Sequence, residues 1–550
     1  MDPWIFLCVI VVLYGVCFFI DRLFKSCMHY PYEIFLKNTG LTVQFMRIRW
    51  HTTAFNRAML RWGNNSGWMR VWLTRTYTVG VLVALSLLPI GIILLFITIF
   101  NEENNSAPHN GISPVGGGVN RENSQNSVLI QNAPKVQILL PGVNLPLEEV
   151  GYYALTLLLC TMVHEFGHAL AAVQEDIPVI GFGLQLYLCL PFAYTEISTE
   201  HLNALKWFKK LRIICAGIWH NFIFACFCYI LLSTLSYVAA PFYTIDHGVV
   251  VTEMSRKSPL LGSSGKGLMV GDIVSQINDC EVNTESDWYE CLQRSLRGTR
   301  LGYCVSHDFI RYNDESIEIS HHSADGMLQC CDERNEKLCC FESVSESLNN
   351  LETVDLTDAA EHAQIPQHVC LDVRRTLEDS SGFCSGINSK SSSSNEGNFC
   401  QSGFCLRPLL RNTTTILTFK RTTRSANSPS KKLRDVIYIG HPADVSSTVR
   451  ISPFVPRQSY ISPQWGDTYA LFLKYNVIFS FGQALLNAIP CFGLDGYHIT
   501  STIVHSFLVQ RIAERPKRDF IALLVASTGT LLFGSALLKV LWMSLMRYIY

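Results

Sequence analysis

His164-Glu165-Phe166-Gly167-His168 lies inside an otherwise apolar run from Val150 to Val173. A run of this length predicts a helix that spans a bilayer, because ~20 apolar residues cover ~30 Å of hydrocarbon. A charged side chain at the centre of such a helix costs roughly 3 kcal/mol on insertion scales, so ionisable residues there usually face a protein interior or a wet cavity and serve a function. The ionisable residues of this stretch are therefore the first candidates for a functional site.

The spacing of the two histidines indicates a metal site. Residues four apart share one face of a helix, so His164 and His168 are placed to hold one metal ion, with Glu165 beside them to act on a water at that metal. Neutral imidazole suits zinc, and a catalytic zinc site leaves one position open for water. The alternative is a pair of hydrogen-bonded core histidines, since HExxH strings also arise by chance. Burial in an apolar run favours the metal site and places it in the membrane.

The composition predicts an integral membrane protein. Of 550 residues, 48% are hydrophobic and 16% are charged, against roughly 25% charged in soluble domains. The net charge of −1 gives no indication of direct nucleic-acid binding. Eleven of the twenty cysteines lie between Cys280 and Cys405, which predicts one disulfide-bonded domain in an oxidising compartment.

The N-terminal segments are predicted to anchor the chain. Trp4–Ile20 is interpreted as an anchor and not as a signal peptide, because it lacks a basic start and a small-residue cleavage site. Residues 21–76 carry nine Lys or Arg and two acids, which favours the cytosol. Tyr77–Phe100 is a second span, although Pro89 at its middle leaves a re-entrant hairpin open as an alternative. Residues 101–149 form a polar loop, to which no chemistry is assigned.

Two further apolar segments follow the HExxH run. Ile177–Ile197 contains Gly and Pro residues that are unfavourable for an ordinary helix, so a membrane-inserted hairpin and a plain interfacial loop are equally open. Leu211–Pro241 is another span, preceded by basic residues that indicate a cytosolic edge. Within it, His220 is a possible further ligand, but an interior hydrogen-bonded histidine is the better supported interpretation. Asn221 is a candidate polar group of the cavity.

Residues 243–460 form the large soluble block. Gly267–Asn278, followed by Asp287-Trp288, resembles the middle of a PDZ domain, a fold that binds peptide ends by adding a strand. The cysteines that interrupt this pattern are interpreted as disulfides, with zinc ligands as the alternative. Asn412 begins an Asn-Thr-Thr acceptor motif for glycosylation, which is consistent with a lumenal domain. Because eleven is odd, at least one thiol of this block stays free or pairs outside it.

The segment Tyr469–Leu508 supplies what the metal site lacks. Pro490 breaks the helix, and two glycines flank the carboxylate of Asp495 at membrane depth. Asp495 is predicted to be the third protein ligand, which leaves the fourth position to water; the alternative is a capping Asp at a turn. Basic residues at 511–518 follow and place Asp495 toward the cytosolic side. Phe520–Met546 is predicted to be the last span.

These motifs together resemble the site-2 protease family of intramembrane zinc metalloproteases. The resemblance rests on HEFGH in one span, on Asn487-x-x-Pro-x-x-x-x-Asp495-Gly in a later one, and on the PDZ-like block between them. It covers most of the chain, apart from the polar loop and parts of the cysteine-rich insert. It implies one Zn²⁺ bound by His164, His168 and Asp495, with Glu165 as general base. It also makes Asn487 and Asn221 candidates for holding substrate or stabilising the oxyanion.

The resemblance further implies a class of substrate. These are membrane-anchored transcription factor precursors, of the sterol regulatory element-binding protein type and the ER-stress factor type, cut within their transmembrane segment after a first lumenal cut by the site-1 protease. The implied location is the Golgi or ER membrane, with the cysteine-rich domain in the lumen and the active site toward the cytosol. Two rival classes remain open: a membrane transporter, and a non-catalytic scaffold with an intramembrane metal site.

The predicted fold is a polytopic α-helical membrane protein with an inserted lumenal PDZ-like, cysteine-rich α/β domain. In chain order the predicted domains are N-terminal membrane segments (1–100), a polar lumenal loop (101–149), the first part of the catalytic membrane core (150–241), the PDZ-like domain with its cysteine-rich insert (242–467), and the second part of the catalytic membrane core (468–550).

Overall fold

The computed structural model of the chain forms two compact units, the first made of residues 1–234 and 470–550 and the second of residues 235–469. Of the predicted polar loop only Glu149 is described, and Asn412 lies outside the described residues. The structure describes residues 3–63, 67–100, 149–187, 190–261, 267–297, 302–317, 321–322, 328–332, 337–344, 367–384, 400, 403–410, 414–425, 428–432, 434–458 and 460–549.

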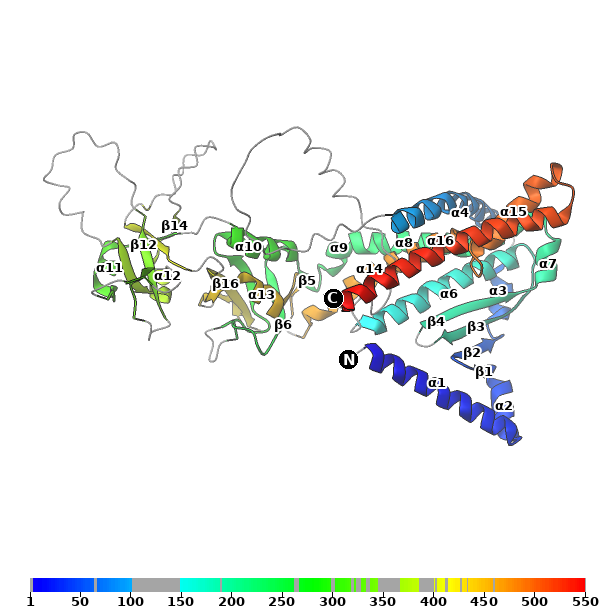
Figure 1. Ribbon diagram of the computed structural model, residues 1–550, viewed down its shortest axis with the longest axis horizontal. Coiled ribbons are helices and arrows are strands. Elements are labelled where there is room, and N and C mark those ends of the chain that lie inside the picture. The colour runs from blue at the N-terminus through cyan, green and yellow to red at the C-terminus, as the bar shows by residue number, and fades with distance from the viewer. Residues whose placement is uncertain are drawn as a thin grey trace. The chain divides into compact units, whose positions relative to one another are not determined.

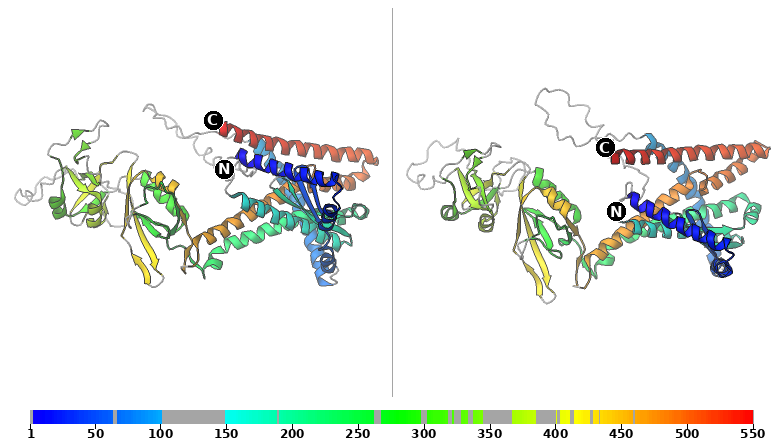
Figure 2. Two further views of the ribbon diagram at one scale, coloured as in Figure 1. Left: turned by 90° about the horizontal axis from the view of Figure 1, so that it is seen from below. Right: turned by 60° about the horizontal axis from the view of Figure 1, so that its bottom comes forward.

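Unit 1 combines long helices with one small sheet (Figures 1 and 2). Its elements, in chain order, are α1 (Pro3–Ser26), α2 (Tyr30–Thr39), β1 (Leu41–Gln44), β2 (Arg47–Thr52), α3 (Asn56–Gly63), α4 (Trp68–Phe100), α6 (Val150–Gln174), β3 (Val179–Tyr187), β4 (Leu190–Ile197), α7 (Thr199–Ala204), α8 (Trp207–Ser233), α14 (Pro463–Ala488), α15 (Asp495–Phe507), a 3-10 turn (Leu508–Gln510) and α16 (Arg515–Ile549).

Four helices of the described residues are long and apolar enough to cross a membrane: α4, α6, α8 and α16. The predicted span Val150–Val173 coincides with α6 to within one residue at its C-terminal end. α4 runs without a break through Pro89, so the alternative of a re-entrant hairpin at Tyr77–Phe100 is wrong. A proline is tolerated in a membrane helix because neighbouring helices and local adjustments satisfy the freed carbonyl.

The α14 helix differs from these four because polar residues recur along it. Tyr475, Ser480 and Gln483 each contact a partner on another helix: the Tyr475 hydroxyl lies 3.3 Å from that of Tyr153, the Ser480 hydroxyl lies 2.9 Å from the Cys160 thiol, and Gln483 accepts from Asn221. Polar groups in membrane helices are commonly paired across helices in this way. The predicted apolar region Tyr469–Leu508 is therefore two helices, α14 and α15, joined by a turn.

The helices pack closely at small residues. α8 lies against α4 and α6, and α16 lies against α4 and α15. A Cβ added at Gly80 of α4 would lie 2.7 Å from the Trp219 ring of α8, and one at Gly91 would lie 2.9 Å from Ile489. Membrane helices lack a hydrophobic driving force between them, so close approach at glycine is a main source of their association.

A four-stranded antiparallel sheet in the order β1-β2-β3-β4 lies beside the helices. The Ile177–Ile197 segment forms the β3–β4 hairpin, and β2 pairs with β3 in the register Trp50↔Leu184. α6 contacts β4, and α3 contacts both α6 and β3. Asn56 at the start of α3 donates to the carbonyls of Val179 and Ile180 on β3. The strands β1 and β2 were not predicted from the sequence.

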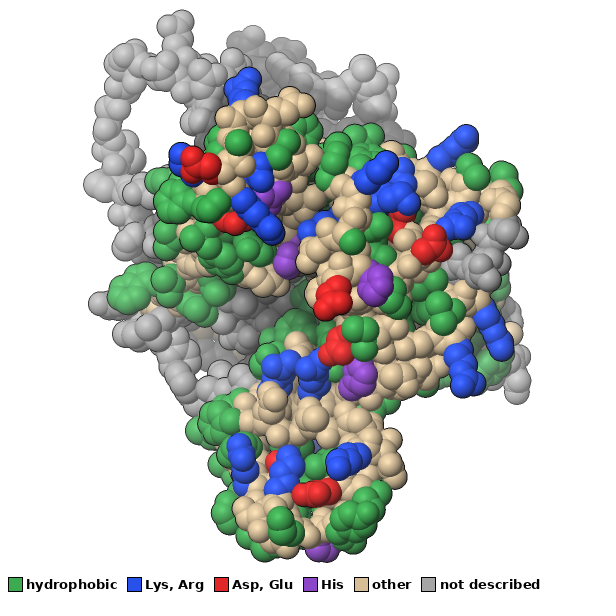
Figure 3. All heavy atoms as spheres, turned by 90° about the vertical axis from the view of Figure 1, so that its right-hand side faces the viewer, with side chains coloured by type: hydrophobic (Ala, Val, Ile, Leu, Met, Phe, Trp, Pro, Cys, Tyr) green, Lys and Arg blue, Asp and Glu red, His purple; other side chains and the backbone are tan. Residues whose placement is uncertain are grey.

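One end of unit 1 is rich in basic side chains. Figure 3 views the end where α7 and the α15–α16 connection lie, and Lys and Arg side chains are spread over this face. Glu175, just after α6, accepts from Lys209 at 2.8 Å and from Arg212 at 3.1 Å. These pairs join the C-terminal end of α6 to the first two turns of α8.

Unit 2 contains many short elements. They are α9 (Leu235–Ala239), β5 (Tyr243–Thr244), β6 (Val249–Met254), β7 (Ile273–Ile277), β8 (Cys280–Glu281), α10 (Glu285–Arg297), β9 (Gly302–Val305), α11 (His307–Asn313), β10 (His321–His322), β11 (Leu328–Gln329), β12 (Leu338–Ser343), β13 (His368–Asp372), α12 (Val373–Asp379), β14 (Phe383–Cys384), β15 (Phe404–Pro408), β16 (Thr415–Ser425), β17 (Ser428–Lys432), β18 (Val436–Gly440), α13 (Pro442–Thr448), β19 (Val449–Ser452) and β20 (Val455–Pro456).

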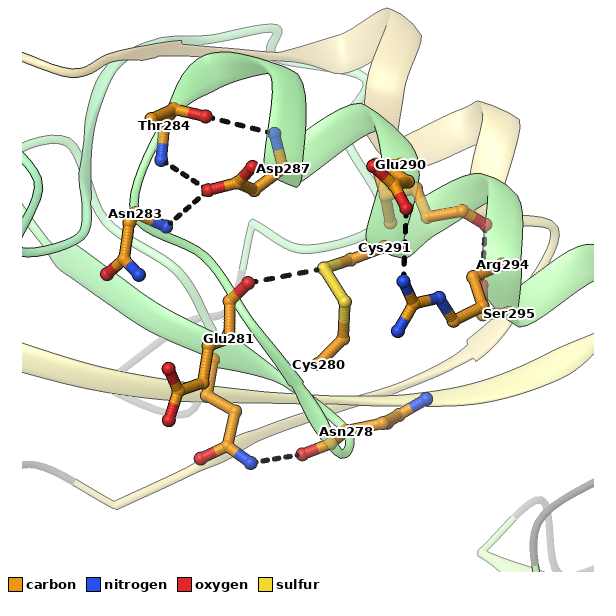
Figure 4. The surroundings of a disulfide bond; sticks show 12 residues. Asn278, Cys280, Glu281, Asn283, Thr284, Asp287, Glu290, Cys291, Arg294 and Ser295 are labelled. Atoms are coloured by element: carbon orange, nitrogen blue, oxygen red, sulfur yellow. Dashed lines mark hydrogen bonds and ion pairs between the residues drawn. A yellow bond between two sulfur atoms is a disulfide. The ribbon is translucent and has the colours of Figure 1, made fainter. Parts of the chain in front are cut away.

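The segment with the PDZ-like pattern lies in a seven-stranded sheet. Its main path is β17-β16-β7-β6-β19, with β18 paired to β16 and β8 to β7. α10 starts with a capping box, in which Asp287 accepts from the amides of Asn283 and Thr284, and Thr284 accepts from the amide of Asp287. These amides stabilise the carboxylate and lower the pKa of Asp287. A disulfide between Cys280 and Cys291 ties α10 to β8 (Figure 4).

The cysteine-rich insert has its own five-stranded sheet, in the order β13-β12-β15-β9-β14. Five disulfides take up ten of the eleven cysteines in this block, which confirms the predicted disulfides, and the eleventh, Cys339, is a buried free thiol. The pairs are Cys280–Cys291, Cys304–Cys400, Cys330–Cys340, Cys331–Cys370 and Cys384–Cys405.

Candidate metal centre

The two histidines of α6 point their ring nitrogens at one another. The Nε2 atoms of His164 and His168 are 3.1 Å apart, and the two residues are 5% and 9% exposed. They lie one helical turn apart on one face of α6, as the spacing predicts. Two buried imidazoles with facing nitrogens are arranged to share a ligand, because two neutral rings can form at most one N–H···N bond with each other.

Asp495 is brought to the histidines by a tight turn between α14 and α15. One of its carboxylate oxygens, Oδ2, lies 3.0 Å from Nε2 of His164 and 3.2 Å from Nε2 of His168. The turn requires glycine at two positions. Gly493 has φ +84°, and a Cβ at Gly496 would lie 2.0 Å from the carbonyl oxygen of Ile489. Asp495 therefore stands at the first position of α15, with its side chain directed toward α6.

A glycine of α8 leaves room for the ring tips. A Cβ added at Gly217 would lie 2.4 Å from Nε2 of His168 and 2.6 Å from Nε2 of His164. Any larger residue would fill the space in which these nitrogens meet the Asp495 carboxylate. A glycine in a membrane helix by itself indicates only close helix packing, whereas the structure shows that Gly217 borders the metal centre itself.

These residues fit a zinc ion. His164, His168 and Asp495 form a group whose ligand atoms all lie within 4.8 Å of one another. Two imidazoles and one carboxylate are a ligand set of catalytic zinc, with the fourth position left to water. Ligand atoms ~2.0–2.2 Å from one tetrahedral zinc are roughly 3.3–3.6 Å apart, so the observed separations would widen by a few tenths of an ångström. The predicted ligands, which come from the two helices α6 and α15, are thus brought together in the structure.

The two imidazole rings are oriented by contacts at their Nδ1 atoms, on the side away from the ligand group. Nδ1 of His168 donates to the carbonyl of Ile213 on α8 at 2.8 Å, which leaves Nε2 as the nitrogen that faces the site. Asn221 Nδ2 lies 3.3 Å from Nδ1 of His164, and Asn221 Oδ1 has no hydrogen-bond partner among the described residues. A half-turn of this amide, together with a half-turn of the Gln483 amide that it contacts, would let Oδ1 accept from Nδ1–H, the tautomer that metal binding through Nε2 requires. Asn221 is then a residue that orients His164.

Glu165 lies outside the ligand group, next to His164 in the chain. Its backbone carbonyl accepts from the Thr195 hydroxyl of β4 at 3.1 Å, and its side chain lines a cavity between α3, α6 and the sheet. No described side chain donates a hydrogen bond to its carboxylate. A carboxylate beside a metal site but not in its ligand set is arranged to exchange protons with a water molecule.

The remaining candidates have different positions. Asn487 is 9% exposed and lies one turn after Gln483 on α14, but within the described residues it makes no hydrogen bond to the ligand group. The assigned role in substrate binding stays a prediction. His220 lies outside the group, with Nδ1 donating to the carbonyl of Ala216 and its ring tilted against Tyr77. This agrees with the interpretation of His220 as an interior histidine.

Sequence reasoning missed two contributors to the site. The Gln483 amide lies 3.1 Å from that of Asn221, within hydrogen-bond distance, and so joins α14 to the residue that orients His164. Its signal was a polar residue four positions before Asn487 in an apolar helix, a spacing that places both on one face. The other contributor is the backbone carbonyl of Ile213, for which a sequence carries no signal.

Known proteins are similar to this chain over most of its length. A family model for peptidase family M50 matches residues 152–532, a range that includes α6, α8, unit 2 and the Asp495 turn. The chain is also similar to the membrane-bound transcription factor site-2 protease homolog of Arabidopsis thaliana. The identity is 24% over 401 residues, which cover 67% of this chain and 72% of that protein.

Proposed function

Because the chain belongs to peptidase family M50, the site-2 protease family, and is a membrane metalloprotease, we propose that it is zinc-dependent and cuts its substrates within their transmembrane segments. The observation that carries the proposal is the His164–His168–Asp495 group, in which two ligands come from a helix apolar enough to cross a membrane. The transporter alternative loses its support, because family membership and the neighbouring carboxylate of Glu165 both favour peptide hydrolysis.

The residues around the ligand group divide the chemistry among them. Zinc, when bound, supplies Lewis acidity that makes a water molecule more acidic and the scissile carbonyl more electrophilic. Glu165 accepts the proton of the attacking water and passes it to the leaving amine. Ile213 and Asn221 hold the two rings with Nε2 directed at the site, which fixes where the substrate carbonyl must lie.

The substrates that we propose are membrane-anchored transcription factor precursors of the sterol regulatory element-binding protein type and the ER-stress factor type. They would be cut after a first lumenal cut by the site-1 protease, so that the cytosolic domain is released. The Arabidopsis relative supports a membrane-bound transcription factor as the substrate class, because it is a membrane-bound transcription factor site-2 protease homolog. The motifs around the site support it as well, since they resemble those of the same family.

For the location we propose the Golgi or ER membrane, with unit 2 in the lumen and the metal centre toward the cytosol. Support comes from the five disulfides, which persist in oxidising compartments, and from the basic residues near the end of α6. Glycosidase treatment of the membrane protein should increase its mobility on a gel, and Asn412→Gln should remove part of that shift. This topology would be contradicted if the protein carried no attached sugar and the cysteines between Cys280 and Cys405 reacted with a thiol reagent without prior reduction.

The proposed reaction is tested with purified protein in detergent and a membrane-anchored substrate. Cleavage should stop with a zinc chelator and return when zinc is added back. Glu165→Gln should lower the rate by about 10²–10⁴-fold, the range for a lost general base, while bound zinc measured by atomic absorption stays at one per chain. Full activity of the Gln variant, or cleavage that persists in chelator, would refute the mechanism.

A further inference from the structure

A cavity of about 280 Å³ lies on the side of α6 adjacent to the metal centre, wholly within unit 1. Its walls come from α3, α6 and the strands β2, β3 and β4, so the N-terminal part of the chain closes a space beside the HExxH helix. One water needs only ~10–15 Å³ of such space, so the cavity is large enough for a side chain or more. Of its lining residues, the proposed reaction uses only Glu165.

The lining of this cavity is apolar with one charged exception. The α6 helix contributes Met162, Glu165 and Phe166 to the lining, at positions that share one helix face. Glu165 is the one charged residue among the lining residues that the structure describes. Glu165, which we assign as general base, therefore lies in the wall of an apolar cavity. A peptide bond that is cut with Glu165 as base must lie next to the opening of this cavity.

The α3 helix forms the opposite wall. Ala58, Met59 and Trp62 line the cavity from α3, and Met59 is 4% exposed whereas Trp62 is 53% exposed. Trp62 packs edge-on against Phe166 with ring centroids 5.8 Å apart. The inner part of the cavity is thus closed by packed side chains, and its rim carries an exposed ring that an entering apolar group can contact.

We propose that this cavity is a specificity pocket that takes a large apolar side chain of the substrate next to the scissile bond, and that Ala58, Met59 and Trp62 set the size it accepts. The proposal rests on the proposed function. A transmembrane substrate consists mainly of apolar residues, and when it unwinds at the site its side chains leave the lipid and need an apolar place. The pocket provides one within reach of Glu165, so that filling it orients the peptide bond.

Competing substrates differ in how fully they fill such a pocket. A difference of one methylene in an apolar pocket changes kcat/KM by about 10–200-fold. We therefore expect the purified protein to discriminate strongly at one substrate position beside the cut, and weakly at the others. A series of substrates with Leu, Phe, Ala or Asp at each position flanking the cut should show one position where the large apolar residues exceed Ala at least tenfold.

The residues of the pocket are tested by changing its size. Ala58→Trp fills the space, and should lower kcat/KM about tenfold or more for the substrate with the preferred large residue while the Ala substrate changes less than threefold. Leu60→Trp is the matched control, because Leu60 lies on the same helix, is 56% exposed and does not line the cavity; it should leave both substrates unaffected. Trp62→Ala widens the pocket and should shift the preference toward bulkier residues.

A binding measurement separates substrate from lipid as the occupant. In the Glu165→Gln protein, a photoreactive residue in place of Trp62 should crosslink to the uncut substrate at the preferred position. The pocket proposal is overturned if Ala58→Trp slows all substrates equally and the crosslink captures phospholipid instead of substrate. It is equally overturned if neither Ala58→Trp nor Trp62→Ala changes the preference. If the unaltered protein cuts no membrane-anchored substrate with zinc present, the proposed function fails first, and that result is recognised without any pocket variant.

Discussion

In unit 1 long helices approach one another at glycines, whereas unit 2 is crosslinked by five disulfides and contains a buried ion pair. Gly80, Gly217 and Gly496 each face an atom that a Cβ would approach within 3 Å. In unit 2, Arg421 and Asp272 form an ion pair at 2.7 Å with both side chains 2% exposed. The same unit contains five disulfides. Helices in lipid gain little from burying apolar surface, so backbone approach and polar pairing stabilise them.

The difference explains why the metal centre is built in unit 1. A charged cluster in an apolar setting is stable only when its geometry is fixed and its charges are compensated. The close helix packing around Gly217 and Gly496 fixes the positions of His164, His168 and Asp495, which is what a ligand set requires. The disulfides of unit 2 instead crosslink the short strands and the α10 helix of that unit, and none of their cysteines belongs to the metal centre.

The largest effect is expected from removing the carboxylate ligand. Asp495→Ala leaves two imidazoles without a third protein ligand, so bound zinc should fall well below one per chain and cleavage should fall to background. Metal content by atomic absorption and cleavage of a membrane-anchored substrate are the two measurements. Unit 2 should stay folded, with its disulfides intact by mass spectrometry. Zinc content unchanged in this variant would remove Asp495 from the ligand set.

The next effect concerns the buried ion pair of unit 2. Arg421 also donates to the carbonyl of Gly267 at 2.6 Å, so Arg421→Leu leaves both the Asp272 carboxylate and this carbonyl without that donor. Breaking a buried pair costs about 3–5 kcal/mol, which should appear as faster proteolysis of unit 2 and earlier unfolding in urea. The double variant with Asp272→Leu should recover much of the loss. Zinc content should be unchanged, and a loss of zinc would show that the two units are not stabilised separately.

The comparison also shows what a sequence can reveal. The α6 helix was predicted nearly to its ends because a long apolar run has one interpretation in lipid, and Asp495 was found because an acid at membrane depth is rare. The pairing of Trp50 with Leu184 was not predictable, since the strand at 47–52 read only as a basic cytosolic stretch. Long-range contacts of this kind depend on which faces meet, and local pattern does not specify them.

The role of Gly217 was missed for the same reason. A glycine in a membrane helix indicates close approach, but the neighbour that approaches is set by the tertiary packing. The disulfide pairing likewise could not be read from the sequence, because ten cysteines have many possible connectivities. The odd number of cysteines in the block did predict that at least one thiol stays free or pairs outside it.

A smaller effect is expected from Gly217→Ala. The new Cβ would lie 2.4 Å from Nε2 of His168, so the ring must move away from the position it shares with His164 and Asp495. A displacement of about 1 Å at a catalytic site lowers the rate about 100-fold, and zinc affinity should weaken too. Gly151→Ala on α6 is the matched control, because a Cβ there has no neighbour within 4 Å. Equal activity of both variants would show that the helices around the site move apart at little cost. Close packing at Gly217 would then not fix the ligand geometry.

The smallest effect is expected at Cys339, the single free thiol that unit 2 retains among its described cysteines. Burial raises the pKa of this thiol to about 12, so at pH 8 only about one molecule in ten thousand carries the reactive thiolate. Iodoacetamide should therefore leave Cys339 unlabelled in the folded protein without reductant, while the exposed Cys27 of unit 1 reacts. Reactivity at Cys339 should rise with pH toward 12, or appear at once when urea unfolds unit 2.

Cys339→Ala should change activity little and stability by about 1 kcal/mol, because the thiol neither crosslinks nor touches the metal centre. Rapid labelling of Cys339 together with the ten paired cysteines in the native protein would mean that the block is reduced and open. Unit 2 would then be stabilised by its apolar cores alone, and the contrast with the glycine-packed membrane unit would lose its basis.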